Sequence, residues 1–151
     1  MAAAPGSVLF ACTLNRVRSP MAAGLMSRLF GNRIFVDSCG LRADPRAGDP
    51  DPFVAAVMDE IGVDLAGHAP KTFADLAEES FDVVITLTPE AQHRAVELAR
   101  RHAVAIDYWP TADPTLAAGS REQILAAYRE VRDGLQARIL DRFGRAATFG
   151  G

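Results

Sequence analysis

The stretch that decides the fold runs from Ser7 to Pro20 and reads SVLFACTLNRVRSP. Its first part, which ends at Cys12, is almost entirely apolar and predicts a short buried strand. Ser19 and Pro20 then predict the start of a helix, because serine caps helices well and proline fits the first helical position. The sequence therefore predicts a tight turn from a strand into a helix.

Outward from this turn, strands and helices alternate. Apolar residues at helical spacing continue to Phe30, and Gly31 stops the helix. Further strands are predicted at Ile34–Asp37, Phe81–Leu87 and Val104–Trp109. Further helices are predicted from Phe53 to Gly62, from a Thr88 cap to about Arg101, and from a Ser120 capping box onward, with loops at Leu41–Pro52 and Thr111–Gly119. This alternation predicts an α/β protein with a parallel sheet covered on both faces.

Length and composition restrict the partners. A chain of 151 residues predicts a single domain over residues 1–151, and a net charge of −3 argues against nucleic acid and anionic membranes. The N-terminus has no basic region, and no apolar run approaches the ~20 residues of a membrane span, so a cytoplasmic location is expected. The two cysteines, Cys12 and Cys39, make no disulfide framework, and no Cys/His cluster has metal-ligand spacing. No metal or other cofactor is expected.

The loop from Cys12 to Ser19 has the features of an oxyanion site. It follows the carboxyl end of a strand, where parallel sheets bind ligands. A tight turn into a helix directs backbone N–H groups inward, and the helix N-terminus adds partial positive charge. Arg18 can bind two oxygens at once, and Asn15 tolerates the left-handed backbone that tight loops need. The predicted oxyanion-binding residues are Thr13, Leu14, Asn15, Arg16, Val17, Arg18 and Ser19.

Cys12 is the candidate nucleophile of this loop. Positive surroundings favour a thiolate, and the Ser19 hydroxyl can donate a hydrogen bond to it. Cysteine is also a common buried residue, so Cys12 indicates catalysis only in combination with Arg18. A phosphate ester attacked by this thiolate needs a proton for its leaving group. Asp113, which precedes Pro114 in the loop after the last strand, is the candidate general acid.

Cys12 through Pro20, between a strand and a helix, resembles the signature of the low-molecular-weight protein tyrosine phosphatase superfamily, which includes thiol-coupled arsenate reductases. The resemblance covers roughly Val8 to Phe143 and includes Ser38-Cys39-Gly40 and Asp113-Pro114. It implies a three-layer fold with a four-stranded parallel sheet in the order 2-1-3-4, and Cys12, Arg18 and Asp113 as catalytic residues. The segments closer to the arsenate reductase branch are Phe81–Leu87, Trp109 through Gly119, and Arg132-Asp133.

The chain departs from the pattern of this superfamily at several positions. Leu14 stands where glycine is usual, Arg16 adds positive charge near the rim of the loop, and Val17 replaces the second loop cysteine of many phosphatases. Thr115-Leu116 replaces the aromatic residues that usually follow Asp-Pro in the tyrosine phosphatases. The resemblance therefore implies the chemistry of the superfamily rather than selectivity for phosphotyrosine.

Three functions stay open. The first is hydrolysis of a phosphomonoester, on a protein or a small molecule, through a phosphocysteine intermediate. The second is reduction of arsenate, an inorganic oxyanion similar to phosphate. Thr88 stands at the relay position of that branch, so an external thiol would be the reductant. The third is a regulatory protein that binds phosphate without catalysis, which the complete set of Cys12, Arg18 and Asp113 argues against.

Other residues near the predicted site have alternative interpretations. Cys39 follows the second predicted strand, so it either forms a protective disulfide with oxidised Cys12 or is a packed small residue. Trp109 is either a substrate wall or a buried anchor. His68 is expected to be structural.

Overall fold

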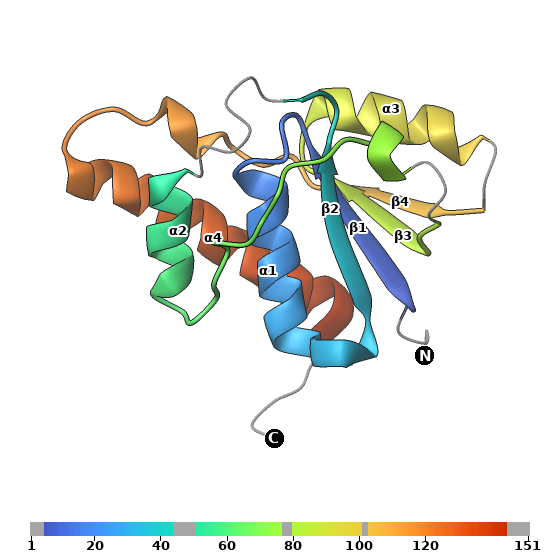
Figure 1. Cartoon of the computed structure of the whole chain (residues 1–151), viewed down its shortest axis with the longest axis horizontal. Helices are drawn as coiled ribbons and strands as arrows, with labels where there is room; N and C mark the ends of the chain where they lie inside the picture. Colours follow the sequence, from blue (N-terminus) through green and yellow to red (C-terminus); the bar gives the residue numbers. More distant parts are fainter. Residues whose placement is uncertain (1–4, 44–50, 77–79, 101–102, 145–151) are drawn as a thin grey trace.

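The computed structural model describes residues 5–43, 51–76, 80–100 and 103–144 (Figure 1). Strands and helices alternate along the chain, as the sequence predicts. The strands are β1 (Ser7–Cys12), β2 (Phe35–Gly40), β3 (Val83–Thr86) and β4 (Ala105–Tyr108). The α-helices are α1 (Arg18–Phe30), α2 (Pro52–Asp59), α3 (Pro89–Ala99) and α4 (Arg121–Phe143), and the short 3-10 turns are η1 (Gly31–Arg33), η2 (Ala74–Leu76) and η3 (Pro114–Leu116).

The strands form one parallel sheet in the order β2-β1-β3-β4, which confirms the predicted topology. The first strand therefore lies inside the sheet. At its carboxyl end, Ala11 pairs with Cys39 of β2 and with Thr86 of β3, and Cys12 pairs with Gly40. The loop after β1 thus leaves the sheet between the ends of two neighbouring strands.

Helices cover both faces of the sheet, so the predicted three-layer arrangement is confirmed. Figure 1 shows α1, α2 and α4 on one side of the sheet and α3 on the other. Because successive side chains of a strand point to opposite faces, β1 contributes to both cores. Val8, Phe10 and Cys12 pack in the core with α1 and α4, whereas Leu9 and Ala11 pack in the core with α3.

The N-terminus of α1 differs from the prediction. This helix begins at Arg18, and Val17 is the N-cap residue, without a side-chain cap hydrogen bond. Ser19, the predicted cap, lies inside the first turn, with its hydroxyl next to the thiol of Cys12. The predicted Ser19 cap is wrong because this hydroxyl has a partner outside the helix.

The later helices begin at capped positions. The predicted caps at Thr88 and Ser120 are confirmed, since each hydroxyl accepts a hydrogen bond from a backbone N–H in the first turn, and Ser120 forms the complete capping box with Gln123. Helix α2 has a cap that the sequence did not predict. Asp51 Oδ1 accepts hydrogen bonds from the backbone N–H groups of residues 53 and 54, at 2.8 and 3.2 Å. A carboxylate at a helix N-terminus also interacts favourably with the helix dipole.

Strand β2 is longer than predicted. It was expected to end at Asp37, but it continues to Gly40, because Ser38, Cys39 and Gly40 pair with the last residues of β1. The small residues predicted to follow the strand are therefore part of it. None of the helices within the described ranges is long and apolar enough to cross a membrane.

Candidate active site

The candidate site lies where β1 ends at Cys12 and α1 begins at Arg18. The connecting loop lies directly against Gly40 of β2. A Cβ on Gly40 would lie 2.8 Å from the backbone N of Asn15 and 2.9 Å from the backbone O of Thr13, closer than real Cβ contacts. The Thr13 carbonyl accepts hydrogen bonds from the N–H groups of Leu41 at 2.8 Å and residue 42 at 3.2 Å. The loop after β1 is thus fixed to the end of the neighbouring strand.

Cys12 is buried, and its Sγ lies 2.9 Å from Ser19 Oγ. The Asn15 side-chain amide donates to the same Oγ at 2.8 Å, and the Cys39 carbonyl lies 3.3 Å away. Because Asn15 occupies the acceptor side of the serine, the proton of the hydroxyl remains for Cys12 or for the carbonyl. A thiolate at Cys12 would attract this proton more strongly than a neutral carbonyl does.

Asn15 organises the loop. It is fully buried and has a φ of 56°, so the predicted left-handed conformation is confirmed. Its side-chain amide also donates to Ser38 Oγ at 2.9 Å, and its Oδ1 accepts from the backbone N–H of Lys71 at 2.9 Å. His68 Nε2 lies 2.8 Å from the Asn15 carbonyl oxygen. One loop residue is thereby connected to β2 and to the segment from His68 to Lys71, both distant in sequence.

His68 is structural, as expected. A carbonyl oxygen can only accept, so Nε2 of His68 carries the hydrogen in its bond to Asn15. Burial lowers the pKa of His68 below its ordinary value of 6.5, although the bond to Asn15 opposes the shift. The imidazole is therefore neutral at pH 7 and acts as a donor that supports the loop.

Arg18 lies between the Cys12 loop and the loop that carries Asp113. Its Nη1 donates to the Thr111 carbonyl at 3.0 Å, and its Nη2 lies 4.0 Å from Asp113 Oδ2. The Arg18 side chain is 15% exposed, so it is held in place while part of it remains accessible. The structure thus brings the predicted cation and the predicted acid together, although they lie far apart in sequence.

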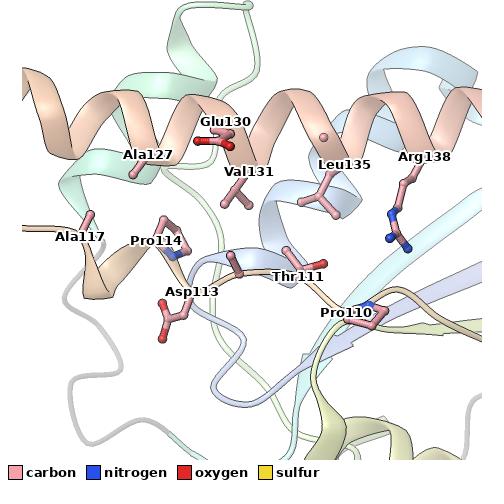
Figure 2. Close-up of a pocket in the computed structure, with 12 residues that line it drawn as sticks. Pro110, Thr111, Asp113, Pro114, Ala117, Ala127, Glu130, Val131, Leu135 and Arg138 are labelled. Atoms are coloured by element: carbon pink, nitrogen blue, oxygen red, sulfur yellow. The ribbon is translucent and has the colours of Figure 1, made fainter.

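The Asp113 carboxylate has two different environments. Oδ1 caps η3, accepting from the backbone N–H of Thr115 at 3.0 Å and from its hydroxyl at 2.6 Å. Oδ2 faces Arg18. Figure 2 shows the Asp113 carboxylate directed away from α4. Behind it, a groove of about 420 Å³ separates this loop from the face of α4 that carries Val131 and Leu135.

The remaining loop residues take different roles. Val17 is buried in the core beside α1. Leu14, which stands where glycine is usual in the superfamily, needs no special backbone, because Asn15 is the only non-glycine residue with positive φ in the described part of the chain. Arg16 was expected to add charge at the rim, but its side chain is only 13% exposed and its Nη1 lies 3.6 Å from Asp51 Oδ2. The added charge is therefore paired inside the protein.

Comparison with known proteins identifies the family of this chain. The family model described as low molecular weight phosphotyrosine protein phosphatase matches residues 7–141. The chain belongs to this family. The resemblance inferred from the sequence is thereby confirmed, and so is the prediction of an enzyme, because the members of the family are cysteine-dependent phosphatases.

Relatives of the chain carry different names. The glutaredoxin arsenate reductase of Synechocystis is 29% identical over 132 residues, which cover 87% of this chain and 92% of that protein. An arsenate reductase structure in the phosphate binding state is 26% identical, with a TM-score of 0.69 and coverage of 93% of this chain and 98% of the other. A tyrosine phosphatase structure from Erwinia amylovora is 20% identical, with a TM-score of 0.75 and coverage of 99% of this chain and 97% of the other. At this identity the likeness shows the fold alone.

In this member of the low-molecular-weight phosphatase family, the side chain of Cys39 does not face that of Cys12. Cys39 pairs with Ala11 and lies in the core with α3, whereas Cys12 lies in the core on the α1 side of the sheet. Burial raises the pKa of the Cys39 thiol, and the charges of Cys12 and Asp37 raise it further. A disulfide needs the two side chains to point toward each other, so the structure favours the packed alternative for Cys39 over the protective disulfide.

Trp109 is a buried anchor rather than a substrate wall. Only 8% of it is exposed, and its ring packs at a tilt against Phe10, with the centroids 6.1 Å apart. The described residues contain no group of three or more Asp, Glu, His and Cys side chains that could hold a metal ion.

The sequence predicted a structural role for His68 but did not identify the contacts that hold this site together. Ser38, His68 and Lys71 bind Asn15, and Thr111 binds Arg18. Thr13 Oγ1 donates to Thr88 Oγ1 at 3.4 Å, a long bond between the loop and the end of β3. The only available signal was position, because residues 38, 88 and 111 come shortly after predicted strand ends, where ligand sites of parallel sheets lie.

Proposed function

We propose that this protein hydrolyses phosphomonoesters through a phosphocysteine intermediate on Cys12. One observation carries the proposal: Asp113 Oδ2 lies 4.0 Å from Arg18 Nη2, so a carboxyl group stands beside the cation that would hold the phosphate. Ester hydrolysis needs a proton donor at this point, because an alkoxide or phenoxide must leave. A phosphate-binding regulatory protein would have no use for such a donor.

In the first step, the Cys12 thiolate attacks phosphorus. The S–P bond forms, the bond from phosphorus to the ester oxygen breaks, and its electron pair goes to that oxygen, which takes the proton of Asp113. Backbone N–H groups of the loop and the Arg18 guanidinium hold the other phosphate oxygens. The Ser19 hydroxyl lies 2.9 Å from the Cys12 sulfur, where it is placed to donate a hydrogen bond to the thiolate that attacks.

In the second step, a water molecule attacks phosphorus through its oxygen, and Asp113 accepts a proton from this water. The S–P bond breaks and its electron pair returns to Cys12 as thiolate, so the products are the alcohol and inorganic phosphate. Asp113 ends protonated, ready for the next cycle. The same carboxyl group thus serves as acid and then as base.

Arsenate reduction is the second candidate, favoured by the name of the Synechocystis relative. Here a Cys12–arsenate adduct would be reduced by thiols. The chain has two cysteines, and Cys39 lies on the other face of the sheet, so reduction would consume two equivalents of an external thiol. That relative is named for glutaredoxin, an external thiol protein.

One experiment separates the candidates. The purified protein is assayed for phosphate release from aryl and alkyl phosphates, and for arsenite formation from arsenate with glutathione, mycothiol or thioredoxin as reductant. Cys12→Ser is the control in each assay. Phosphate release that depends on Cys12 supports the proposal. Arsenite formation without esterase activity would replace it with the second candidate. Phosphate binding without either reaction would indicate a regulatory protein.

A further inference from the structure

The loop carries a second arginine whose partner is buried. Arg16 and Asp51 have side chains that are 13% and 6% exposed, and Arg16 Nη1 lies 3.6 Å from Asp51 Oδ2. The proposed chemistry uses the guanidinium of Arg18 and makes no use of this pair. A partly buried ion pair needs a reason, because removing two charges from water is costly.

Asp51 is itself held by groups other than Arg16. Its Oδ1 caps α2, and its Oδ2 accepts a hydrogen bond from the hydroxyl of Tyr128 on α4 at 3.0 Å. Burial and the negative charge of Asp51 raise the pKa of Tyr128, so the hydroxyl remains a donor over the working pH range. The carboxylate is thus fixed by two helices, and the more flexible arginine must come to it.

We propose that Asp51, held by Tyr128 and by the first turn of α2, neutralises Arg16 and thereby sets how tightly the Cys12–Ser19 loop binds an oxyanion. Asp51 is a tuning residue, which acts through the charge of Arg16 and touches no reacting atom. The inference rests on the proposed function in so far as the loop must bind phosphate.

A physical argument gives the direction of the effect. Loss of the Asp51 carboxylate would add one positive charge beside the loop, which would attract substrate, transition state and phosphate product alike, since all carry negative charge. Such uniform binding lowers KM without raising kcat, and it slows release of product. With Arg16 paired to Asp51, Arg18 is the chief side-chain cation that binds the phosphate, and release of the phosphate product stays fast.

Asp51→Asn is the main test, because asparagine is also a good N-cap and preserves the start of α2. At low ionic strength, phosphate should bind about 3- to 10-fold more tightly, as expected for one added charge near an anion site. KM should fall with it, and kcat should not rise. Arg16→Gln should shift phosphate affinity the opposite way, and the double variant should return to within about twofold of wild type, because the charges again cancel.

Asp59→Asn is the matched control. It makes the same change in net charge at the other end of α2, about 12 Å away, on an exposed residue. Screening should keep its effect on phosphate affinity below about twofold. Phosphate affinity is read from the rate at which uncharged iodoacetamide alkylates Cys12 at increasing phosphate, located by mass spectrometry, so the readout needs no turnover.

The outcomes separate the two proposals. If phosphate protects Cys12 in the wild-type protein but Asp51→Asn behaves like Asp59→Asn, or if the double variant stays as tight as Asp51→Asn alone, the tuning role of Asp51 is overturned. If phosphate does not protect Cys12 even in the wild type, the proposed function fails, and the inference fails with it.

Discussion

Two loops meet at the carboxyl edge of the sheet, and they are held in opposite ways. The Cys12–Ser19 loop is largely enclosed, with Cys12, Asn15, Val17 and Ser19 buried, and Asn15 ties it to residues 38, 68 and 71. The Asp113 loop lies at the surface, where the Asp113 side chain is 32% exposed and Leu116 is 80% exposed. Its own turn holds Asp113, through Thr115. Arg18 joins the two loops directly, through its hydrogen bond to the Thr111 carbonyl and its ion pair with Asp113.

This difference matches two chemical tasks. A nucleophile and its anion cradle must hold their geometry without substrate, since misplacement by about 1 Å can cost 10²-fold in rate. A proton donor must reach leaving groups of different shapes, so a less constrained loop suits it. The predictions below test this division.

The largest effect is expected for Cys12→Ser, which should abolish turnover and leave phosphate affinity within a few-fold of wild type. The hydroxyl is a poor nucleophile at its ordinary pKa, whereas the backbone N–H groups and Arg18 remain. Initial rates measure the first effect, and titration calorimetry with phosphate measures the second. Loss of phosphate binding together with turnover would mean that the thiol, rather than the loop, holds the anion.

Asp113→Asn should come next, with a loss of about 10²–10⁴ in kcat for alkyl phosphates, because positioned proton transfer is worth this much. The loss should be smaller for nitrophenyl phosphate, whose leaving group departs without help. Steady-state rates on the two substrate types give the comparison. Equal, small losses on both would remove Asp113 from the mechanism and leave the surface loop without a catalytic task.

Arg18→Lys should lower kcat/KM by about 10²–10³, the range for loss of a transition-state donor. A point charge cannot bind two phosphate oxygens in one plane, and it cannot also hold the Thr111 carbonyl. Arg138→Lys, on α4 behind the Asp113 loop, is the matched control and should remain near wild type. Near-wild-type kinetics from Arg18→Lys would show that the guanidinium does not join the two loops to the anion.

Asn15→Ala and Thr115→Ala compare how the loops are held. Asn15→Ala should lower the free energy of unfolding by about 2–4 kcal/mol, since it orphans buried partners and places alanine at positive φ. Thr115→Ala, at an exposed position, should change it by less than about 0.5 kcal/mol. Urea denaturation measures both. Similar costs at the two sites would contradict the contrast between a buried and a surface loop.

The smallest effect is expected for His68→Gln and depends on pH. The folded state lowers the pKa of His68, so the unfolded chain binds more protons as pH falls below 6.5. The contribution of His68 is complete above pH 6.5 and is lost as pH falls toward the folded-state value. The wild-type protein should therefore lose more unfolding free energy than His68→Gln between pH 7.5 and pH 5.5. Identical pH dependence in the two proteins would exclude this contribution.

Local signals predicted one half of the site. The strand, the turn, the helix and the left-handed Asn15 all follow from residues 7 to 20, because neighbours in sequence determine them. The contacts of Asn15 with Ser38 and Lys71 span 23 and 56 positions. No local pattern encodes such pairs, and the sheet order that brings them together came from the resemblance to a family.

One local prediction failed and one open alternative was decided, each for a definite physical reason. Ser19 has the residue type of a cap, but its hydroxyl satisfies Cys12 instead. Cys39 and Cys12 lie at one sheet edge, which left a disulfide between them open, but the edge does not determine the face of the sheet to which each side chain points. Extension of β2 by three residues places Cys39 opposite Ala11 and in the other core. A one-residue shift in strand parity thus decides whether two thiols can meet.

The missing side chain at Gly40 has a consequence for folding. If β2 slipped by one residue against β1, Cys39 or Leu41 would lie opposite Cys12, and its Cβ would occupy space that the backbone of the Cys12 loop now fills. A misregistered sheet could pair its strands, but it could not close that loop. Closure of the Cys12 loop therefore depends on the native register of β2, because a glycine must lie opposite Cys12.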